Sequence, residues 1–568
     1  MKTKLSLLLC ASLLLGLLAG CGTGNSAADS VVSTEPQTTQ APVNVPDVPA
    51  ETASNEEASL AETPEKPDMT ISMPLTEEDV SFTMWHDFVP PLAEFIDGME
   101  ENLAYQTMEE ISGVHMEITS VSKESAATNV ALLVASGDYP NLWDGFAGYY
   151  GQGIDTAIEA DIIHDLADYK DLMPNYFHTV DSDETYSKET YTDTGAMGLA
   201  YCLNTKHVIE SGLVIRQDWL DALDLDVPVT YDDFTEVLTA MHNAYGACFW
   251  TAYMGDDCTK SISAGFGVTA YNNGSETYFE QIDGNVVFSP LENGYLDYVT
   301  LMNQWYTAGI LYPDFISGTS TTTCEPDQIG SGQISLVSCP AGLLDPFYGV
   351  ASDPNFELTA VARPVQKEGD IVHQGASVTM TSMDGFSVGT SISDGDEDFD
   401  ILLKWLDYWY TQDGSDLANY GVEGVSYTRD ADGSAVFTEL MTNNPDGAAF
   451  TLCMNRYALF VGSFLNDNTR AASTYTEKQH ACVDFWSENS GDGAYVYPMG
   501  ISLTTEESDA FSSAYSDIAT YVESETLGFI TGSVPLSEYE SFCNTIRSMG
   551  IDELIGIYQD ALDRYNAR

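Results

Sequence analysis

The sequence predicts an α/β protein that is built from more than one lobe. Short apolar runs of strand character alternate with amphipathic helical runs along the chain, a pattern typical of α/β proteins with mainly parallel sheets. Hydrophobic residues make up 44% of the sequence, which is enough to form a core. Roughly 490 residues follow a polar N-terminal stretch, and this length exceeds one ordinary hydrophobic core.

The N-terminus has the pattern of a secretory signal. Lys2 and Lys4 precede an apolar run from Leu5 to Ala19, which is too short for a permanent membrane span. The run ends in LAGC, which resembles the lipobox of bacterial lipoproteins, so Cys21 is the expected site of lipidation. We therefore expect residues 1–20 to be removed and two acyl chains on Cys21 to hold the protein at the outer face of a cell membrane.

The stretch 21–76 is rich in Ser, Thr, Ala, Pro and Glu and has almost no large apolar side chains. Such a composition cannot form a core, so we expect a disordered tether. The whole chain has 88 acidic and 19 basic residues, a net charge of -69. A surface of this charge repels nucleic-acid phosphates and anionic lipid headgroups, so we expect no nucleic-acid partner and no membrane contact beyond the lipid.

Eight cysteines remain after Cys10 and Cys21 are set aside, and none of the eight forms a CxxC pair. Disulfides are compatible with an exported protein, the pairs closest in sequence being Cys248 with Cys258 and Cys324 with Cys339. Buried free thiols are equally compatible with the pattern.

Several helices are predicted with their ends. The run ESAATNVALLVASG stops at Gly137, a residue suited to a left-handed cap. In VPVTYDDFTEVLTAMHNAYG, Thr230 is a candidate N-cap with Asp233 three residues later. FDILLKWLDYWYTQDG carries Trp405 on an apolar stripe, and a helical ending is interrupted near 532–535 and at Gly550.

Four ordered blocks of sequence carry a family resemblance: ASGDYPNLWDGF, LVIRQDWLDALDLDVPVTYDDFTEVLTAM, WLDYWYTQDGSDLANYGVEGVSYTRDADG and ETLGFITGSVPLSEYESFCNTIRSMGIDELIGIYQDALDRY. They resemble extracellular solute-binding protein family 1, especially its larger sugar-binding lipoproteins. The resemblance implies a two-lobed periplasmic-binding-protein type II fold with a ligand cleft between the lobes. It also implies lobe 1 from 77–204 and 384–424 and lobe 2 from 205–383 and 425–568, with crossovers near 201–206, 384–388 and 421–427.

In open α/β sheets a ligand lies beyond the carboxyl ends of the strands, and sugars need aromatic faces together with polar groups. These criteria select Trp85 and His86 after the first strand, and Trp143, Asp144 and Tyr149 after a later one.

Further candidates come from the family topology and from segments outside the matched blocks. Arg216 either faces the ligand or pairs with Asp218 or Asp221. The stacking candidates are Trp250, Tyr253, Phe386 and Trp486. With few cations in the chain, a neutral saccharide is a better expected ligand than a polyuronate.

An enzyme is the main alternative. GFSVG at 385–389 matches the G-x-S-x-G elbow around Ser387, but turn-forming residues follow where a helix would have to begin. No carboxylate pair is singled out for a glycosidase, and no metal-ligand motif is present. A non-sugar solute such as a peptide is a further alternative.

We therefore expect a monomeric, non-enzymatic binding component of an ABC importer. It needs no cofactor, binds an oligosaccharide and delivers it to the transmembrane permease subunits.

Overall fold

The computed structural model describes residues 69, 71–88, 92, 95–206, 208–250, 257–270, 272, 277–313, 315, 324–374, 380–460, 462–498 and 500–568. Within these ranges the strands form a six-stranded sheet, a four-stranded sheet and two small hairpins. Separate hydrophobic cores surround the two larger sheets. The expected α/β, two-lobed architecture is thus confirmed.

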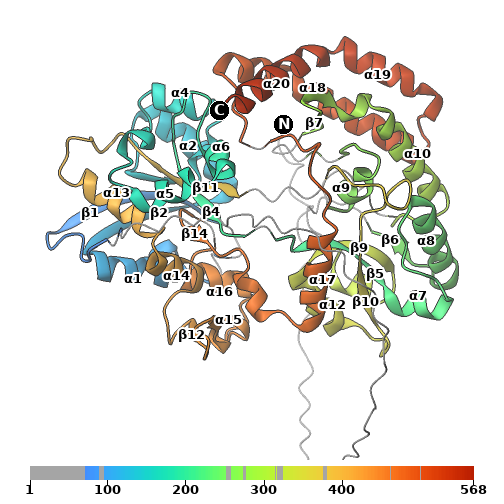
Figure 1. Ribbon diagram of the computed structural model, residues 1–568, viewed down its shortest axis with the longest axis horizontal. Coiled ribbons are helices and arrows are strands. Elements are labelled where there is room, and N and C mark those ends of the chain that lie inside the picture. The colour runs from blue at the N-terminus through green and yellow to red at the C-terminus, as the bar shows by residue number, and fades with distance from the viewer. Residues whose placement is uncertain are drawn as a thin grey trace, which may run out of the picture. The chain divides into compact units, whose positions relative to one another are not determined.

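The first lobe is built on the six-stranded sheet, in the order β14-β4-β11-β3-β1-β2 (Figure 1). β1 runs parallel to β2 and β3, whereas β11 is antiparallel to both β3 and β4. The lobe contains β1 (Val80–Phe88), a 3-10 turn (Met99–Glu101), α1 (Leu103–Ser112), β2 (Val114–Ser122), α2 (Lys123–Ser136), β3 (Leu142–Asp144), α3 (Phe146–Tyr149), α4 (Ile154–Glu159), a 3-10 turn (Leu166–Tyr169), α5 (Pro174–Asp181), α6 (Glu184–Thr190), β4 (Ala200–Asn204), β11 (Thr381–Val388), α13 (Phe399–Tyr408), α14 (Gln412–Tyr420), β12 (Tyr427–Arg429), β13 (Ala435–Phe437), α15 (Glu439–Thr442), α16 (Phe450–Tyr457) and β14 (Leu465–Asn466).

The second lobe is built on the four-stranded sheet, in the order β10-β5-β9-β6. β6 is parallel to β9, and β5 is antiparallel to both of its neighbours, β9 and β10. The lobe contains β5 (Ser211–Arg216), α7 (Gln217–Leu223), α8 (Tyr231–Tyr245), β6 (Cys248–Phe249), α9 (Asp257–Ala264), β7 (Phe279–Ile282), β8 (Asn285–Phe288), a 3-10 turn (Ser289–Leu291), α10 (Asn293–Thr307), α11 (Pro326–Gly330), β9 (Ile334–Pro340), a 3-10 turn (Ala341–Leu343), α12 (Leu344–Val350), β10 (Leu358–Val361), α17 (Glu477–Glu488), α18 (Thr505–Thr531), a 3-10 turn (Leu536–Glu538), α19 (Tyr539–Ser548) and α20 (Ile551–Asn566).

The chain passes from one sheet to the other between β4 and β5, between β10 and β11, and between β14 and α17, where a 3-10 turn spans Arg470–Thr474. The last of these passages lies later than the 421–427 expected from the family topology. β14 pairs with β4, and Asn102 of the first lobe donates to the carbonyl oxygens of Asn455 and Ala458 at 2.7 Å each. These bonds keep residues 425–466 with the first sheet, so the expected boundary at 424 differs from the structure.

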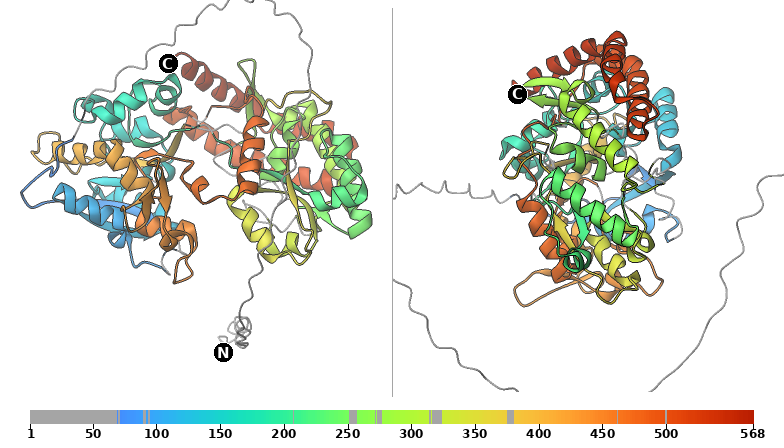
Figure 2. Two further views of the ribbon diagram at one scale, coloured as in Figure 1. Left: turned by 60° about the horizontal axis from the view of Figure 1, so that its bottom comes forward. Right: turned by 90° about the vertical axis from the view of Figure 1, so that its right-hand side faces the viewer.

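Local signals in the sequence position several helix ends as predicted. Thr230 and Asp233 form a reciprocal capping box at the start of α8. Gly137 caps α2 in the left-handed conformation, with φ of 73°. Gly532 ends α18 and Gly550 precedes α20, which divides the red C-terminal part of the chain in Figure 1 and Figure 2 into α18, α19 and α20.

Two further features concern the helices and the cysteines. No helix in the described part of the chain combines the length and apolarity that a membrane crossing requires. Cys248 and Cys339 are thiols, so neither of the cysteine pairs closest in sequence is joined by a disulfide.

Candidate functional site

Three parallel strands of the first sheet end at the same edge. Because β1, β2 and β3 run in one direction, His86 and Asp87 of β1, Asp144 of β3, and Lys123, which follows β2, lie at their carboxyl ends. In open α/β sheets this is the edge at which ligands bind. We call these four residues, together with Tyr149 of α3, the first-sheet edge.

The centre of the first-sheet edge is a buried ion pair. His86 Nδ1 lies 2.5 Å from Asp144 Oδ2, and both side chains are almost fully buried. Burial alone would disfavour the charged imidazolium, but the Asp144 carboxylate, helped by Asp87, outweighs it and raises the pKa of His86. The pair therefore favours the protonated imidazolium more than an isolated histidine does.

A second polar group at this edge is more accessible. The Tyr149 hydroxyl donates to Asp87 Oδ2 at 2.5 Å, and Lys123 Nζ lies 3.7 Å from the same oxygen. Tyr149 and Asp87 are half-buried and Lys123 is exposed. The Tyr149 ring stands edge-on against Trp85 at 5.8 Å, so an aromatic side chain and polar groups of both charges lie together.

Trp85 and Trp143 lie beneath this edge and do not present a ring to solvent. They are 2% and 0% exposed, and their ring centroids are 6.2 Å apart. Trp85 Nε1 donates to Asn129 Oδ1 at 2.8 Å. A stacking platform needs an open ring face, which neither buried indole has; Trp85 instead packs against Tyr149, the more accessible ring.

The second sheet has a corresponding edge. β6, β9 and β10 run in one direction, because β5 is antiparallel to both β9 and β10 and β6 is parallel to β9. Arg363 follows the carboxyl end of β10 and lines a small pocket with Trp486 and Ser490. Its Nη1 donates to the carbonyl oxygen of Ser490 at 3.0 Å.

The segments after β10 and after α17 together add an aromatic and acidic group to this side. His373 Nδ1 lies 3.0 Å from both carboxylate oxygens of Asp492. The His373 ring lies 4.5 Å from the ring of Tyr495 at an interplanar angle of 35°. His373 and Tyr495 are both half-buried, so this group combines a ring face with hydrogen-bonding atoms. We call Arg363, His373, Asp492 and Tyr495 the second-sheet edge.

Of the two roles expected for Arg216, facing the ligand or pairing with an acidic side chain, the structure shows pairing with Asp218. Arg216 forms two hydrogen bonds with Asp218, at 2.8 and 2.6 Å, and its guanidinium lies 3.8 Å from the Trp219 ring and 4.6 Å from the Phe356 ring. Because β5 runs opposite to its neighbours, its carboxyl end points to the far side of the second sheet. The structure therefore places Arg216 away from the second-sheet edge.

The other aromatic candidates are not brought together. Trp250 is buried in the second core and Phe386 in the first, where it contacts Trp405. Trp486 is buried too, and its Nε1 donates to the Leu213 carbonyl at 3.1 Å. Its ring covers Gly212, where a Cβ atom would come within 2.5 Å. Tyr253 and Cys21 lie outside the described residues.

The G-x-S-x-G match lies inside a strand. Ser387 is a fully buried residue of β11, which is hydrogen-bonded to β3 on one side and β4 on the other. A nucleophile elbow needs an exposed serine at a turn from strand to helix. The geometry of Ser387 is therefore not that of a hydrolase nucleophile.

The sequence criterion missed several residues of the two edges. Asp87, Lys123 and Arg363 follow or end strands, so the same criterion would have selected them. His373 and Asp492 come from segments far apart in the chain, and nothing in their local sequence links them.

The chain is similar to known proteins in both sequence and structure. No family model matches the chain. The curated Lipoprotein LipO of Bacillus subtilis (strain 168) is 23% identical over 367 residues, which are 61% of this chain and 67% of LipO.

Three solved structures illustrate the similarity in fold, and each aligns with 86% of this chain and 99% of its own. They are alginate-binding protein AlgQ2 (TM-score 0.66, 18% identity), an HMO-binding, ABC-transporter-associated solute-binding protein of Bifidobacterium longum infantis (0.68, 16%) and the S. pneumoniae ABC-transporter substrate-binding protein FusA in complex with kestose (0.66, 18%). The chain has the two-lobed fold of the ABC-transporter solute-binding proteins. At these identities the similarity concerns the fold, and the ligand has to be argued from this chain's own residues.

Proposed function

We propose that the chain is the substrate-binding component of an ABC importer and that it holds a carbohydrate between its lobes without changing it chemically. The observation that carries the proposal is the fold, which the chain shares with an alginate-binding protein, an HMO-binding protein and a substrate-binding protein in complex with kestose. The residues at the two sheet edges give the proposal its chemistry.

Both edges offer what a sugar requires. A sugar ring has flat C–H faces and a rim of hydroxyls, which suit aromatic side chains next to charged donors and acceptors. Tyr149 with Asp87 and Lys123, and Tyr495 with His373 and Asp492, are two such groups. We infer that these groups contact the ligand from the two lobes.

A neutral oligosaccharide fits these groups better than a polyanion such as alginate. Three basic side chains at the two edges are already paired with Asp144, Asp87 and Asp492, so they leave little positive charge to compensate a chain of uronates. The chain as a whole carries 88 acidic residues against 19 basic ones.

We infer that the protein is held outside the cell by lipid on Cys21 and meets the permease there as a monomer. The lipobox-like LAGC supports the anchor, and the partial similarity to Lipoprotein LipO agrees with it. Two acyl chains supply stable anchoring that a single chain does not.

The test is a thermal-unfolding screen of the full chain against plant, fungal and host oligosaccharides, with alginate oligosaccharides included. At a ligand concentration about a hundredfold above Kd, a true ligand adds about 2.7 kcal/mol to the unfolding free energy. Mass spectrometry of the recovered ligand should show it unchanged. Release of cleaved products would support a glycosidase, and a response to peptides alone would contradict sugar binding.

Matched variants test the site itself. For the sugar that responds in the screen, Asp144→Ala should weaken binding at least tenfold, because it removes the partner of His86. Arg216→Ala is the control: it should cost about 3–5 kcal/mol of stability, since it removes the guanidinium that pairs with the Asp218 side chain, which is only 7% exposed, yet leave the affinity unchanged. Equal affinities in Asp144→Ala and the unsubstituted protein would contradict the first-sheet edge as the site.

A further inference from the structure

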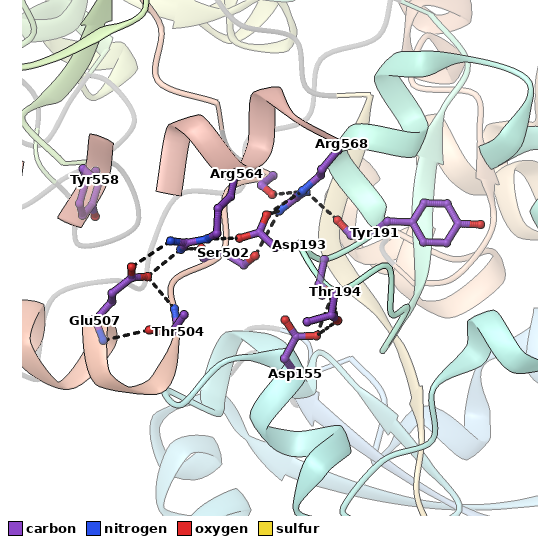
Figure 3. A network of polar contacts seen from close by, with 12 residues as sticks. Asp155, Tyr191, Asp193, Thr194, Ser502, Thr504, Glu507, Tyr558, Arg564 and Arg568 are labelled. Atoms are coloured by element: carbon purple, nitrogen blue, oxygen red, sulfur yellow. Dashed lines mark hydrogen bonds and ion pairs between the residues drawn. The ribbon is translucent and has the colours of Figure 1, made fainter. Parts of the chain in front are cut away.

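Two arginines at the end of the described chain reach a carboxylate in the other lobe (Figure 3). Arg564 Nε lies 2.7 Å from Asp193 Oδ2, and Arg568 Nε and Nη2 lie 2.9 and 2.6 Å from Asp193 Oδ1. Glu507 accepts both Nη groups of Arg564, at 2.9 and 2.7 Å. We call Asp193, Glu507, Arg564 and Arg568 the α20 clasp.

The guanidinium of Arg568 is the most completely bound part of the α20 clasp. Besides Asp193, it donates to the carbonyl oxygens of Lys188 and Tyr191 at 2.8 and 2.6 Å, and to that of Gly500 at 2.8 Å. Its side chain is only 9% exposed. Charge-assisted hydrogen bonds in such a shielded place are stronger than those of exposed ion pairs.

The residues on the two sides of the α20 clasp belong to different cores. Asp193 lies between Tyr186 and Met197, which are buried in the core of the first lobe. Leu554 and Leu562 of α20 are buried in the core of the second lobe. The three covalent passages between the lobes lie in other parts of the chain. The α20 clasp is therefore a non-covalent connection between the lobes, made by the side chains of Arg564 and Arg568.

Hydrogen bonds on both sides of Asp193 tie its loop to the rest of the first lobe. Thr192 and Thr194, on either side of Asp193, both donate to Asp155 Oδ1, at 2.7 and 2.8 Å. Figure 3 shows Thr194 and Asp155 next to the clasp. Because the loop is braced on both sides of Asp193, we expect the carboxylate to stay with the first lobe if the lobes separate.

Neighbouring contacts extend the same junction. Thr156 and Thr505 hydroxyls lie 2.6 Å apart, and Ser508 donates to the Gly151 carbonyl at 3.3 Å. A Cβ atom at Gly500 would lie 2.8 Å from Glu189 Cα, so the backbones approach closely here.

We propose that the α20 clasp restrains the separation of the two lobes, so that opening requires the contacts of Arg568 with the first lobe to break. Hydrogen bonds weaken steeply beyond about 3.5 Å, so a lobe displacement of about 1 Å at this point disrupts several of them together. A chain with 88 acidic and 19 basic residues places two of its cations on one carboxylate, and that carboxylate is in the other lobe. This inference concerns the free protein and does not depend on which ligand binds.

The test measures the distance between the lobes in the full chain without ligand. A fluorescent donor and acceptor are attached through unnatural amino acids at Leu132 of α2 and Val350 of α12, both exposed side chains, so that the native thiols stay unlabelled. Single-molecule energy transfer should give a longer mean distance and a broader distribution for Asp193→Asn and for Arg568→Ala than for the parent protein. Arg568→Lys should give a mean distance between those of Arg568→Ala and the parent protein, because lysine lacks the guanidinium fork.

The control is Glu109→Gln, which removes the partner of His115 within the first lobe, a pair 3.0 Å apart. This variant should leave the distance distribution unchanged. Circular dichroism checks that each variant is folded, and if Asp193→Asn is not, Arg568→Ala decides, because it removes no residue from either hydrophobic core. Parent-like distributions in a folded Arg568→Ala, or an equal shift in Glu109→Gln, would overturn the proposal.

Discussion

Protonation of His86 at the first-sheet edge depends on two carboxylates of unequal influence. Asp144 is in direct contact and raises the pKa of His86 more than Asp87 does, while burial acts in the opposite direction. Because the pKa is raised in the folded state, the stability that this pair contributes is complete below about pH 6.5 and is lost as the pH rises through the folded-state pKa.

We expect Asp144→Asn to lower the pKa of His86, because burial then acts without its main opposing charge. Asp87→Asn should lower it by less. Both changes are measured by NMR titration of histidine-labelled protein, with the His86 signal assigned from its absence in His86→Gln. An unchanged titration midpoint in Asp144→Asn would show that the ion pair does not control this histidine.

The same residues show how far sequence reasoning reaches at this scale. The strand-end criterion placed His86, Asp144 and Tyr149 together, because β1 and β3 are parallel. The family topology left Arg216 between facing the ligand and pairing with an Asp, since the direction of β5 relative to its neighbours cannot be read from local sequence. The criterion identifies an edge but not the direction of a side chain, which is why Trp85 and Trp143 were selected although they are buried.

At the scale of elements, helix ends were predictable where capping residues mark them, as at α8 and α2. The hairpin β7–β8 was not anticipated, because residues 248–284 match none of the four family blocks. One face of this hairpin packs Phe279 against Tyr558 of α20, and the other carries Glu280 into the lobe. Ser289, just after β8, donates to Glu280 Oε2 at 2.6 Å.

Glu280 makes the stability of this hairpin depend on pH. Its side chain is almost fully buried, and burial raises its pKa to about 8, although the bond from Ser289 acts in the opposite direction. The folded protein therefore keeps a proton that the unfolded chain has lost. The contribution of Glu280 to stability is complete below its unfolded-state pKa and disappears as the pH rises through the folded-state value.

We expect the unfolding free energy of the parent protein to fall between about pH 5 and pH 8, with a contribution from Glu280 of at most about 1.4 kcal/mol per pH unit. Glu280→Gln should remove this part of the slope, whereas Glu553→Gln on the exposed face of α20 should not. Denaturant unfolding at several pH values measures the slope of the unfolding free energy against pH in each protein. Identical slopes in Glu280→Gln and the parent would contradict a protonated Glu280.

At the scale of the whole molecule, the two-lobed α/β architecture was predictable from chain length, alternating patterns and four ordered blocks. The place where the chain finally leaves the first lobe was not. That passage depends on the pairing of the short strand β14 with β4 and on bonds from Asn102 to residues more than three hundred positions away, which no local pattern encodes.

Net charge acts on the same scale. With a charge of -69, repulsion among carboxylates opposes the compact state, and it is strongest at low ionic strength. Raising NaCl from about 10 mM to about 1 M shortens the Debye length from about 30 Å to about 3 Å and screens this repulsion. Salt has the opposite effect on the α20 clasp, because it weakens the attraction between the arginines and the carboxylates. The low exposure of Arg568 and Asp193 limits this weakening.

We therefore expect the first thermal transition to occur at a higher temperature in 1 M NaCl than in 10 mM NaCl, by about 2–4 °C for each kcal/mol gained, with scanning calorimetry as the measurement. Arg568→Ala should gain more from salt than the parent, because it has lost the attraction that salt weakens and keeps the repulsion that salt relieves. A transition temperature that falls with salt in both proteins would mean that local ion pairs, and not net charge, dominate the electrostatics of this molecule.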